Sequence, residues 1–161
     1  MASIASPAEP TAPLAPSPAE RILLFSLGER VYGCRVDGVR EIIPSRRATR
    51  LPGAPDFVRG LINLRGSLLT VVDLGVRLGE PQPARPDGST ILVEQAGRVL
   101  GLAVDEVMDV QALPTDRLDG ASAAGEIAGR NAGIVRGLGH LGDGRVVILL
   151  DIHSVVRQVL R

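Results

Sequence analysis

A glycine-rich run near the C-terminus matches the pattern with which dinucleotide-binding proteins approach a pyrophosphate. Gly137–Gly142 has the spacing G-x-G-x-x-G, which in those proteins follows a strand, opens a helix and precedes an acidic residue about 20 positions later. Here the strand-like segment Arg145–Leu150 follows, and only 19 of the 161 residues come after Gly142. Because the rest of a βαβ unit has no room, we interpret the run as a glycine-rich hairpin connection.

Other side chains that could catalyse a reaction or hold a metal are few and scattered. The soft metal ligands are Cys34, His140 and His153, and none stands at a metal-ligand spacing from another. Neither histidine lies in a pattern that sets it beside a nucleophile. Asp105 and Glu106 are adjacent carboxylates, which in a strand point to opposite faces and cannot share a proton. The sequence therefore predicts a protein that is not an enzyme and that uses neither cofactor nor metal.

The elements that would position functional residues are mostly short strands. Runs rich in Val, Ile and Leu are separated by Gly, Asp-Gly or Pro, which is typical of antiparallel β structure closed into small barrels. The predicted strands are Ile22–Leu27, Val31–Val36, Leu61–Leu64, Ser67–Val72, Thr90–Glu94, Val99–Val104, Ala132–Arg136 and Val146–Leu150.

Helices are predicted to be short. The candidates are Val39–Ile43, Asp56–Gly60, Leu74–Leu78 after Asp73, and Ile152–Leu160, whose apolar residues have helical spacing. Two further segments are read as irregular. Pro81–Gly88 is predicted to connect two β units, and Ala121–Gly129 to form an exposed loop.

Length and composition indicate one domain with a real core, since 45% of the 161 residues are hydrophobic. Residues 1–20 are rich in Ala, Pro and Ser and hold five of the 12 prolines, so we expect a disordered tail before a folded part spanning 21–161. A lone cysteine excludes a disulfide scaffold. With no apolar stretch near the roughly 20 residues of a membrane span and no basic residue before Arg21, the predicted location is the cytoplasm.

Charge argues against a nucleic-acid protein but keeps one alternative open. The net charge is zero, whereas proteins held on nucleic acid by a basic surface are usually strongly basic. Arg46, Arg47 and Arg50 could still form a phosphate-binding patch on a small barrel. Only three aromatic residues are available to stack on bases, so this remains the alternative from another functional class.

Several segments, taken in order, resemble the CheW family, the coupling proteins of bacterial chemotaxis. The resemblance spans about residues 21–161, and the most specific block contains Asn63-Leu64-Arg65-Gly66. The matching segments are 25–33, 39–43, 55–66, 71–74, 101–107, 137–143 and 147–152.

The resemblance implies a mainly β fold and an adaptor function. The fold would be two small five-stranded, SH3-like β barrels that share a hydrophobic interface, with short helices and a C-terminal helix. The partners would be the regulatory domain of a CheA-type histidine kinase and the cytoplasmic tip of methyl-accepting chemoreceptors, joined in arrays at the inner face of the membrane. A groove between the barrels would take the receptor helix tip, with apolar residues near Val39, Leu61 and Ile62 as candidates to meet it.

The resemblance also carries over individual protein-interaction residues. Glu41 and Arg65 match a family pair that forms a salt bridge near the partner surfaces. The other matching positions are Val39, Gly60, Gly66 and Gly101. For these, a core valine and glycines needed only for their backbone conformation are equally open interpretations.

Two residues depart from the family pattern. Thr70 stands where the family usually has Pro, and Gly75 stands where it usually has Arg. The first restores a backbone donor that we expect to alter edge pairing. The second removes a charge that would help to select partners. Together they leave open a chemosensory pathway that controls something other than swimming.

Overall fold

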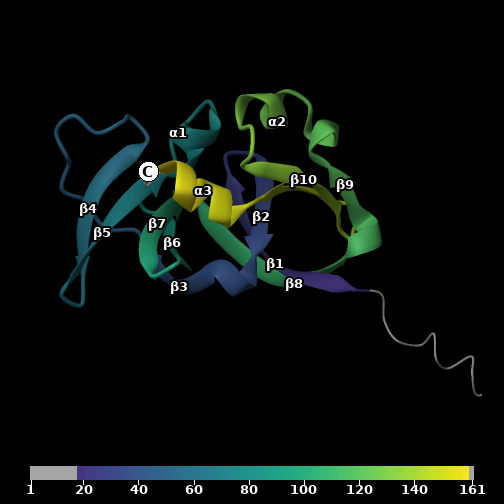
Figure 1. Ribbon diagram of the computed structural model, residues 1–161, viewed down its shortest axis with the longest axis horizontal. Coiled ribbons are helices and arrows are strands. Elements are labelled where there is room, and N and C mark those ends of the chain that lie inside the picture. Colours follow the sequence, from purple (N-terminus) through teal and green to yellow (C-terminus); the bar gives the residue numbers. More distant parts are fainter. Residues whose placement is uncertain (1–17, 160–161) are drawn as a thin grey trace, which may run out of the picture.

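The computed structural model describes residues 18–159, which form two β sheets with short helices around them (Figure 1). The larger sheet has six strands in the order β8 (Glu106–Pro114), β1 (Ala19–Leu27), β2 (Arg30–Arg35), β11 (Val146–Leu150), β10 (Val135–His140) and β9 (Leu118–Gly120). The smaller has five strands in the order β3 (Val39–Pro44), β6 (Ser89–Gln95), β7 (Arg98–Val104), β5 (Ser67–Asp73) and β4 (Val58–Leu64).

This arrangement confirms a mainly β fold built from two units. The larger sheet exceeds the expected five strands because the three residues of β9 pair with β10. Most of the predicted tail lies outside the described residues. Its last two positions, Ala19 and Glu20, already belong to β1, where they pair with the end of β8.

The two sheets are intertwined along the chain. The chain begins the larger sheet with β1 and β2, makes all five strands of the smaller sheet, and returns to the larger one with β8. The returning chain inserts β11 beside β2 in parallel. Pro81–Gly88 lies between β5 and β6 of the same sheet, so the prediction that it connects two β units is wrong.

The predicted C-terminal helix and the helix after β5 are both present. α1 (Leu74–Leu78) begins where the Asp73 carboxylate accepts a hydrogen bond from the Val76 amide at 3.0 Å, and it ends at Gly79 with φ 81°. α3 (Ile152–Val159) begins beside Asp151, whose carboxylate accepts from the Ser154 amide at 3.3 Å. Leu160, the predicted last residue of that helix, lies outside the described residues.

Other predictions of secondary structure are wrong. Val39–Ile43 is the edge strand β3, because a bulge between Val39 and Glu41 accommodates the apolar spacing that resembled a helix. In the segment Asp56–Gly60, Asp56 and Phe57 form a turn and the last three residues are the start of β4. Ala121–Gly129 contains the 3-10 helix η4 (Ala121–Ala124) and most of α2 (Glu126–Arg130).

The glycine-rich run is partly strand. Gly137–His140 belongs to β10, and only the turn that follows is a hairpin connection. A Cβ on Gly137 would lie 1.9 Å from the Asp119 carbonyl oxygen, and one on Gly139 would lie 2.5 Å from Leu113. The glycines therefore allow close packing of neighbouring strands, which is a structural reason for the motif.

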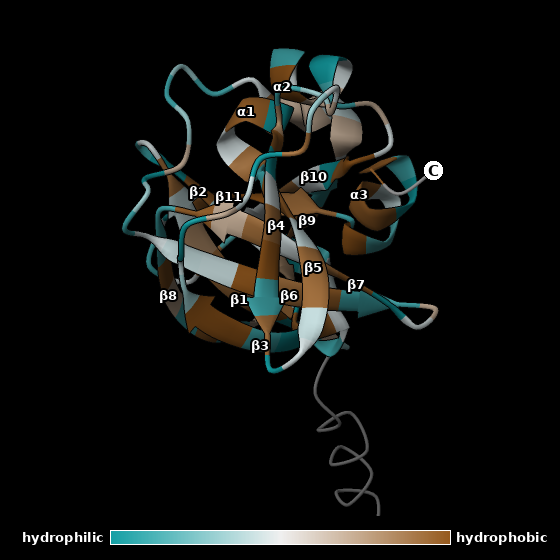
Figure 2. Ribbon diagram, turned by 90° about the vertical axis from the view of Figure 1, so that its left-hand side faces the viewer, coloured by the Kyte–Doolittle hydropathy of each residue, from teal (hydrophilic) through white to brown (hydrophobic). Residues whose placement is uncertain are grey.

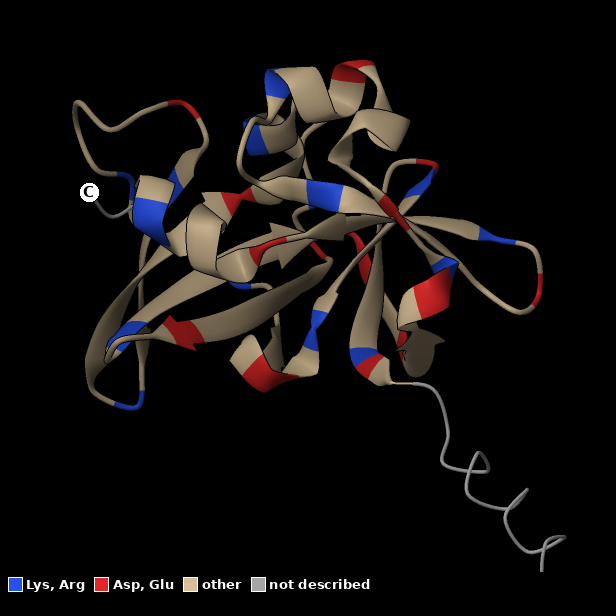
Figure 3. Ribbon diagram, turned by 45° about the vertical axis from the view of Figure 1, so that its right-hand side comes forward, with Lys and Arg blue, Asp and Glu red and all other residues tan. Residues whose placement is uncertain are grey.

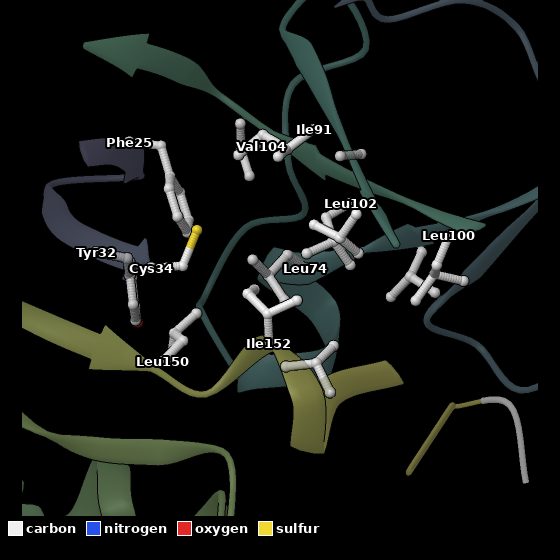
Figure 4. Packing of buried hydrophobic residues seen from close by; sticks show 14 of the residues in the cluster. Phe25, Tyr32, Cys34, Leu74, Ile91, Leu100, Leu102, Val104, Leu150 and Ile152 are labelled. Carbon is white, nitrogen blue, oxygen red and sulfur yellow. The ribbon is translucent and has the colours of Figure 1, made fainter. Parts of the chain in front are cut away.

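A shared hydrophobic core joins the two sheets. Phe25, Tyr32 and Cys34 from the larger sheet belong to the same buried cluster as Leu74 and Leu102 from the smaller unit (Figure 4). Apolar residues concentrate along the strands where the sheets face each other (Figure 2). Within residues 18–159, no helix combines the length and the apolar character that crossing a bilayer requires.

Candidate functional site

The predicted pair of Glu41 and Arg65 forms a salt bridge across the smaller sheet. Glu41 lies on β3, and Arg65 lies in the turn between β4 and β5. These strands stand at opposite ends of the sheet order, so the Arg65 guanidinium, donating to the Glu41 carboxylate, joins the two edges of the curled sheet. The Arg65 side chain is 68% exposed and that of Glu41 34% exposed. Such an exposed pair contributes only about 0–1 kcal/mol to stability.

Arg65 adopts a backbone conformation that most residues avoid. Its φ is 51° and that of Gly66 is 89°, which are the two positive values of a two-residue type I′ hairpin turn. Holding a non-glycine residue there costs about 1–2 kcal/mol. The Asn63 side-chain oxygen accepts a hydrogen bond from the Gly66 amide at 3.0 Å, and the Asn63 carbonyl accepts one from Arg46 at 3.1 Å.

A groove lies beneath this ion pair. Its volume is about 280 Å³, and its lining combines charged, polar and aliphatic side chains from all five strands of the smaller sheet and the turn: Arg40, Glu41, Leu64, Arg65, Ser67, Leu69, Leu92 and Val99. Leu68 lies between Ser67 and Leu69 on β5 and therefore points to the opposite face of the strand, where it is 66% exposed, the highest value among the large hydrophobic residues of 18–159 found on the surface. The sequence reasoning did not single out Asn63 or Leu68 for function. The alternation of β5 was the only signal for Leu68.

The other predicted interaction residues do not gather around the ion pair. Val39 is half-buried against the core, and Gly101 is buried between Thr90 and Val71 in the middle of the sheet. Gly60 is buried with φ 136°, and a Cβ there would lie 2.0 Å from the Thr49 carbonyl oxygen. Gly60 and Gly101 therefore have packing reasons to be glycine, whereas Gly66 is exposed beside Arg65.

A second, larger groove lies between the two sheets. Its volume is about 560 Å³, and its lining is mostly polar: Arg35, Asp37, Gly38, Glu94, Gln95, Ala96, Arg136, Leu150, Asp151, Ile152 and His153. Arg136 is held by Glu20 through two hydrogen bonds of 2.7 and 3.0 Å. The Arg136 guanidinium keeps the pKa of Glu20 below its ordinary value.

The expected apolar lining of this groove is wrong. Ile62 is 4% exposed and belongs to the core, so it is not available at a surface. Leu61 pairs its backbone with Thr49 outside the groove. Val39 lies beside Gly38, which does line it. The groove between the sheets is therefore charged at its walls and apolar only around Leu150 and Ile152.

A buried polar contact ties the two sheets together near α1. The Tyr32 hydroxyl on β2 donates to the Glu80 carboxylate, which also accepts from Arg30 at 3.0 Å. The Glu80 side chain is 5% exposed. Burial raises the pKa of the Tyr32 hydroxyl, and the neighbouring carboxylate raises it further. This contact supports the relative position of the sheets and has no sign of catalysis.

Both departures from the family pattern lie inside the fold. Thr70 is on β5, which has β4 on one side and β7 on the other, so its backbone donor is not at a sheet edge and our expectation of altered edge pairing is wrong. Gly75 is buried in α1, where a Cβ would lie 3.1 Å from backbone atoms of Gln82 and Ala84. A larger residue at position 75 would push the segment that follows α1.

The arrangement gives little support to nucleic-acid binding. Phe25 and Tyr32 are fully buried, and Phe57 packs under the guanidinium of Arg77 at 5.6 Å. No aromatic ring of these three is free to stack on a base. Figure 3 shows acidic and basic residues on both halves of the molecule. Among residues 18–159, no group of three metal-ligating side chains comes together.

Comparison with known proteins assigns the family. A family model described as CheW-like domain matches residues 21–160. The chain is 32% identical to the chemotaxis protein CheW of Klebsiella aerogenes, over 85% of this chain and 81% of that relative. It is 28% identical to the chemotaxis protein CheW of Thermotoga maritima, over 86% of this chain and 88% of that one. The crystal structure of the scaffolding protein TtCheW from Thermoanaerobacter tengcongensis is similar, with a TM-score of 0.75 and 30% identity over 84% of this chain and 91% of that chain. The chain therefore belongs to the CheW family.

Proposed function

We propose that this protein is a chemosensory scaffold that couples a CheA-type histidine kinase to the cytoplasmic tip of chemoreceptors. Family membership supports this, as does the likeness to a chemotaxis protein and to a scaffolding protein. The protein would act by presenting surfaces, without catalysis. Its place would be the inner face of the membrane, reached through the receptor arrays.

The observation that carries the proposal is the exposed ion pair between Glu41 and Arg65 at the hairpin turn. Arg65 and Glu41 add little to stability. Arginine is one of the residues in which interface hot spots are enriched. We assign the surface defined by Glu41, Arg65 and Gly66 to the kinase regulatory domain and call it the kinase-facing surface.

The groove between the sheets is the better candidate for the receptor tip. It is the larger of the two grooves, and its walls come from both sheets. A helix can lie in such a groove with its charged residues beside Arg35 and Asp151, while Leu150 and Ile152 beneath them are part of the buried core. Each pairwise contact is expected in the micromolar range, about −8 kcal/mol. The strength of an array would come from many linked contacts.

A titration of the kinase regulatory domain tests the proposal. Wild-type protein is expected to bind saturably at micromolar concentration, and Arg65→Ala to weaken binding at least about tenfold, or about 1.4 kcal/mol. Arg21→Ala is the matched control, because it removes an exposed arginine from β1 on the other sheet. A folded Arg65→Ala protein that binds like the wild type would contradict the assignment. Nanomolar binding to a single isolated receptor hairpin would contradict the proposal that each pairwise contact is weak and that the array is held by many linked contacts.

A further inference from the structure

The turn that carries Arg65 is held from outside the turn itself. Both central residues of a type I′ turn need positive φ, and Asn, Asp and Gly are favoured there over arginine. Arg65 takes the first central position with φ 51°. Its own salt bridge to Glu41 is exposed, so that contact alone is a weak restraint. The Leu64–Ser67 pair closes the hairpin, and a further group next to the turn restrains its conformation.

Asn63 provides that restraint with two different parts of one residue. Its side-chain oxygen accepts from the Gly66 amide at 3.0 Å, which ties the end of β4 to the second central residue of the turn. Its backbone carbonyl accepts from Arg46 at 3.1 Å. Arg46 follows β3, the strand that bears Glu41. The two hydrogen bonds therefore link the turn to the opposite edge of the sheet, which the salt bridge between Arg65 and Glu41 also does.

Burial does not explain Asn63. The residue is exposed at a hairpin end, and its side chain contributes nothing to the hydrophobic core. An exposed strand residue is free to be almost any polar type unless its side chain has a specific partner. The partner here is the Gly66 amide, three residues on.

We propose that Asn63 is the positioning residue of the kinase-facing surface. It fixes the type I′ turn so that the Arg65 guanidinium lies over the Glu41 carboxylate before the partner arrives, and Arg46 braces it from the loop after β3. Binding is stronger because the turn is already ordered in the free protein, so that no binding free energy is lost in ordering it. The binding measurement that tests this inference rests on the proposed function. A second measurement, hydrogen exchange in the free protein, does not depend on it.

A double-mutant cycle tests whether Asn63 acts through Arg65. Asn63→Leu removes the acceptor at nearly constant size, and Asn63→Asp keeps an acceptor oxygen. In titrations with the kinase regulatory domain, Asn63→Leu is expected to weaken binding about tenfold and Asn63→Asp no more than about twofold. In the Arg65→Ala background, Asn63→Leu should cause no further loss. Independent, additive losses would overturn the proposal.

Hydrogen exchange of the Gly66 amide gives the readout that needs no partner. In the free protein, Asn63→Leu is expected to speed this exchange at least about tenfold, with Asn63→Asp close to wild type. Amides of β7, in the middle of the same sheet, serve as the internal control for folding. If the wild type fails to bind the kinase domain, the proposed function is contradicted, and the exchange result still decides the positioning role. Unchanged exchange at Gly66 would overturn it.

Discussion

Replacing Gly60 with alanine should destabilise the protein, because the backbone of Thr49 lies too close to Gly60 to leave room for a methyl group. Gly60 has φ 136°, and an added Cβ would lie 2.0 Å from the Thr49 carbonyl oxygen and 2.6 Å from its carbon. That oxygen accepts from the Leu61 amide, and the Thr49 amide donates back to Leu61, both at 2.8 Å. The new methyl group cannot fit without separating these two segments.

The size of the effect follows from these contacts. A non-glycine residue in this backbone region costs about 1–3 kcal/mol, and each lost backbone hydrogen bond about 0.5–1.5 kcal/mol. We therefore expect Gly60→Ala to lower the free energy of unfolding by about 4 kcal/mol. For a chain of this size that is about 12 °C in Tm. Urea unfolding and thermal unfolding both measure it.

Gly53→Ala is the matched control. Gly53 also has a positive φ, 80°, but no atom lies within 4 Å of the Cβ that would be added. This variant should carry only the backbone cost, about 1–2 kcal/mol. If the two variants lost the same stability, the close approach to Thr49 would not be the reason for glycine at position 60. A direct partner contact would then become the better explanation.

Three further predictions concern buried or paired groups. Tyr32→Phe leaves Glu80 without one of its donors and should cost about 1.5–3 kcal/mol in urea unfolding. Burial raises the pKa of the Cys34 thiol to about 12, so a thiol reagent at pH 8 should label it only as fast as the protein unfolds. Glu20→Gln should cost about 1 kcal/mol at neutral pH. Because Arg136 keeps the pKa of Glu20 below 4.5, the carboxylate stabilises the folded state above its unfolded pKa. The difference from wild type should therefore vanish as pH falls through the folded value, and a difference independent of pH would exclude the ion pair as its cause.

Local sequence signals predicted the two helices that have a capping residue or a helical spacing of apolar residues. Asp73 before an apolar run predicted α1, and the helical spacing from Ile152 predicted α3. β3 was mistaken for a helix because a bulge changes the period of an edge strand, and the pattern alone does not reveal a bulge. β8 was missed because much of it is exposed, so its residues show no clean alternation.

The candidate site depended on contacts between distant parts of the chain. Glu41 and Arg65 are 24 positions apart, and no local spacing rule joins two opposite sheet edges. The family resemblance predicted the pair, and the structure confirms the salt bridge while its role in binding stays a prediction. Arg65 and Gly66 lie between two predicted strands, Leu61–Leu64 and Ser67–Val72, but the contribution of Asn63 is visible only in the structure, where its side-chain oxygen lies beside the Gly66 amide.

The intertwined path of the chain determines which sheet can be completed first while the ribosome synthesises the protein. The smaller sheet is made from one continuous stretch, Val39–Val104, and has all its strands once β7 has emerged. The larger sheet must wait for β11, which lies between β2 and β10. Until then the β1–β2 hairpin, which carries Phe25 and Tyr32, lacks the strands β11, β10 and β9 of its own sheet. The core cluster places both rings against residues of the smaller sheet, so the first sheet to fold can shelter the hairpin and limit aggregation of the growing chain.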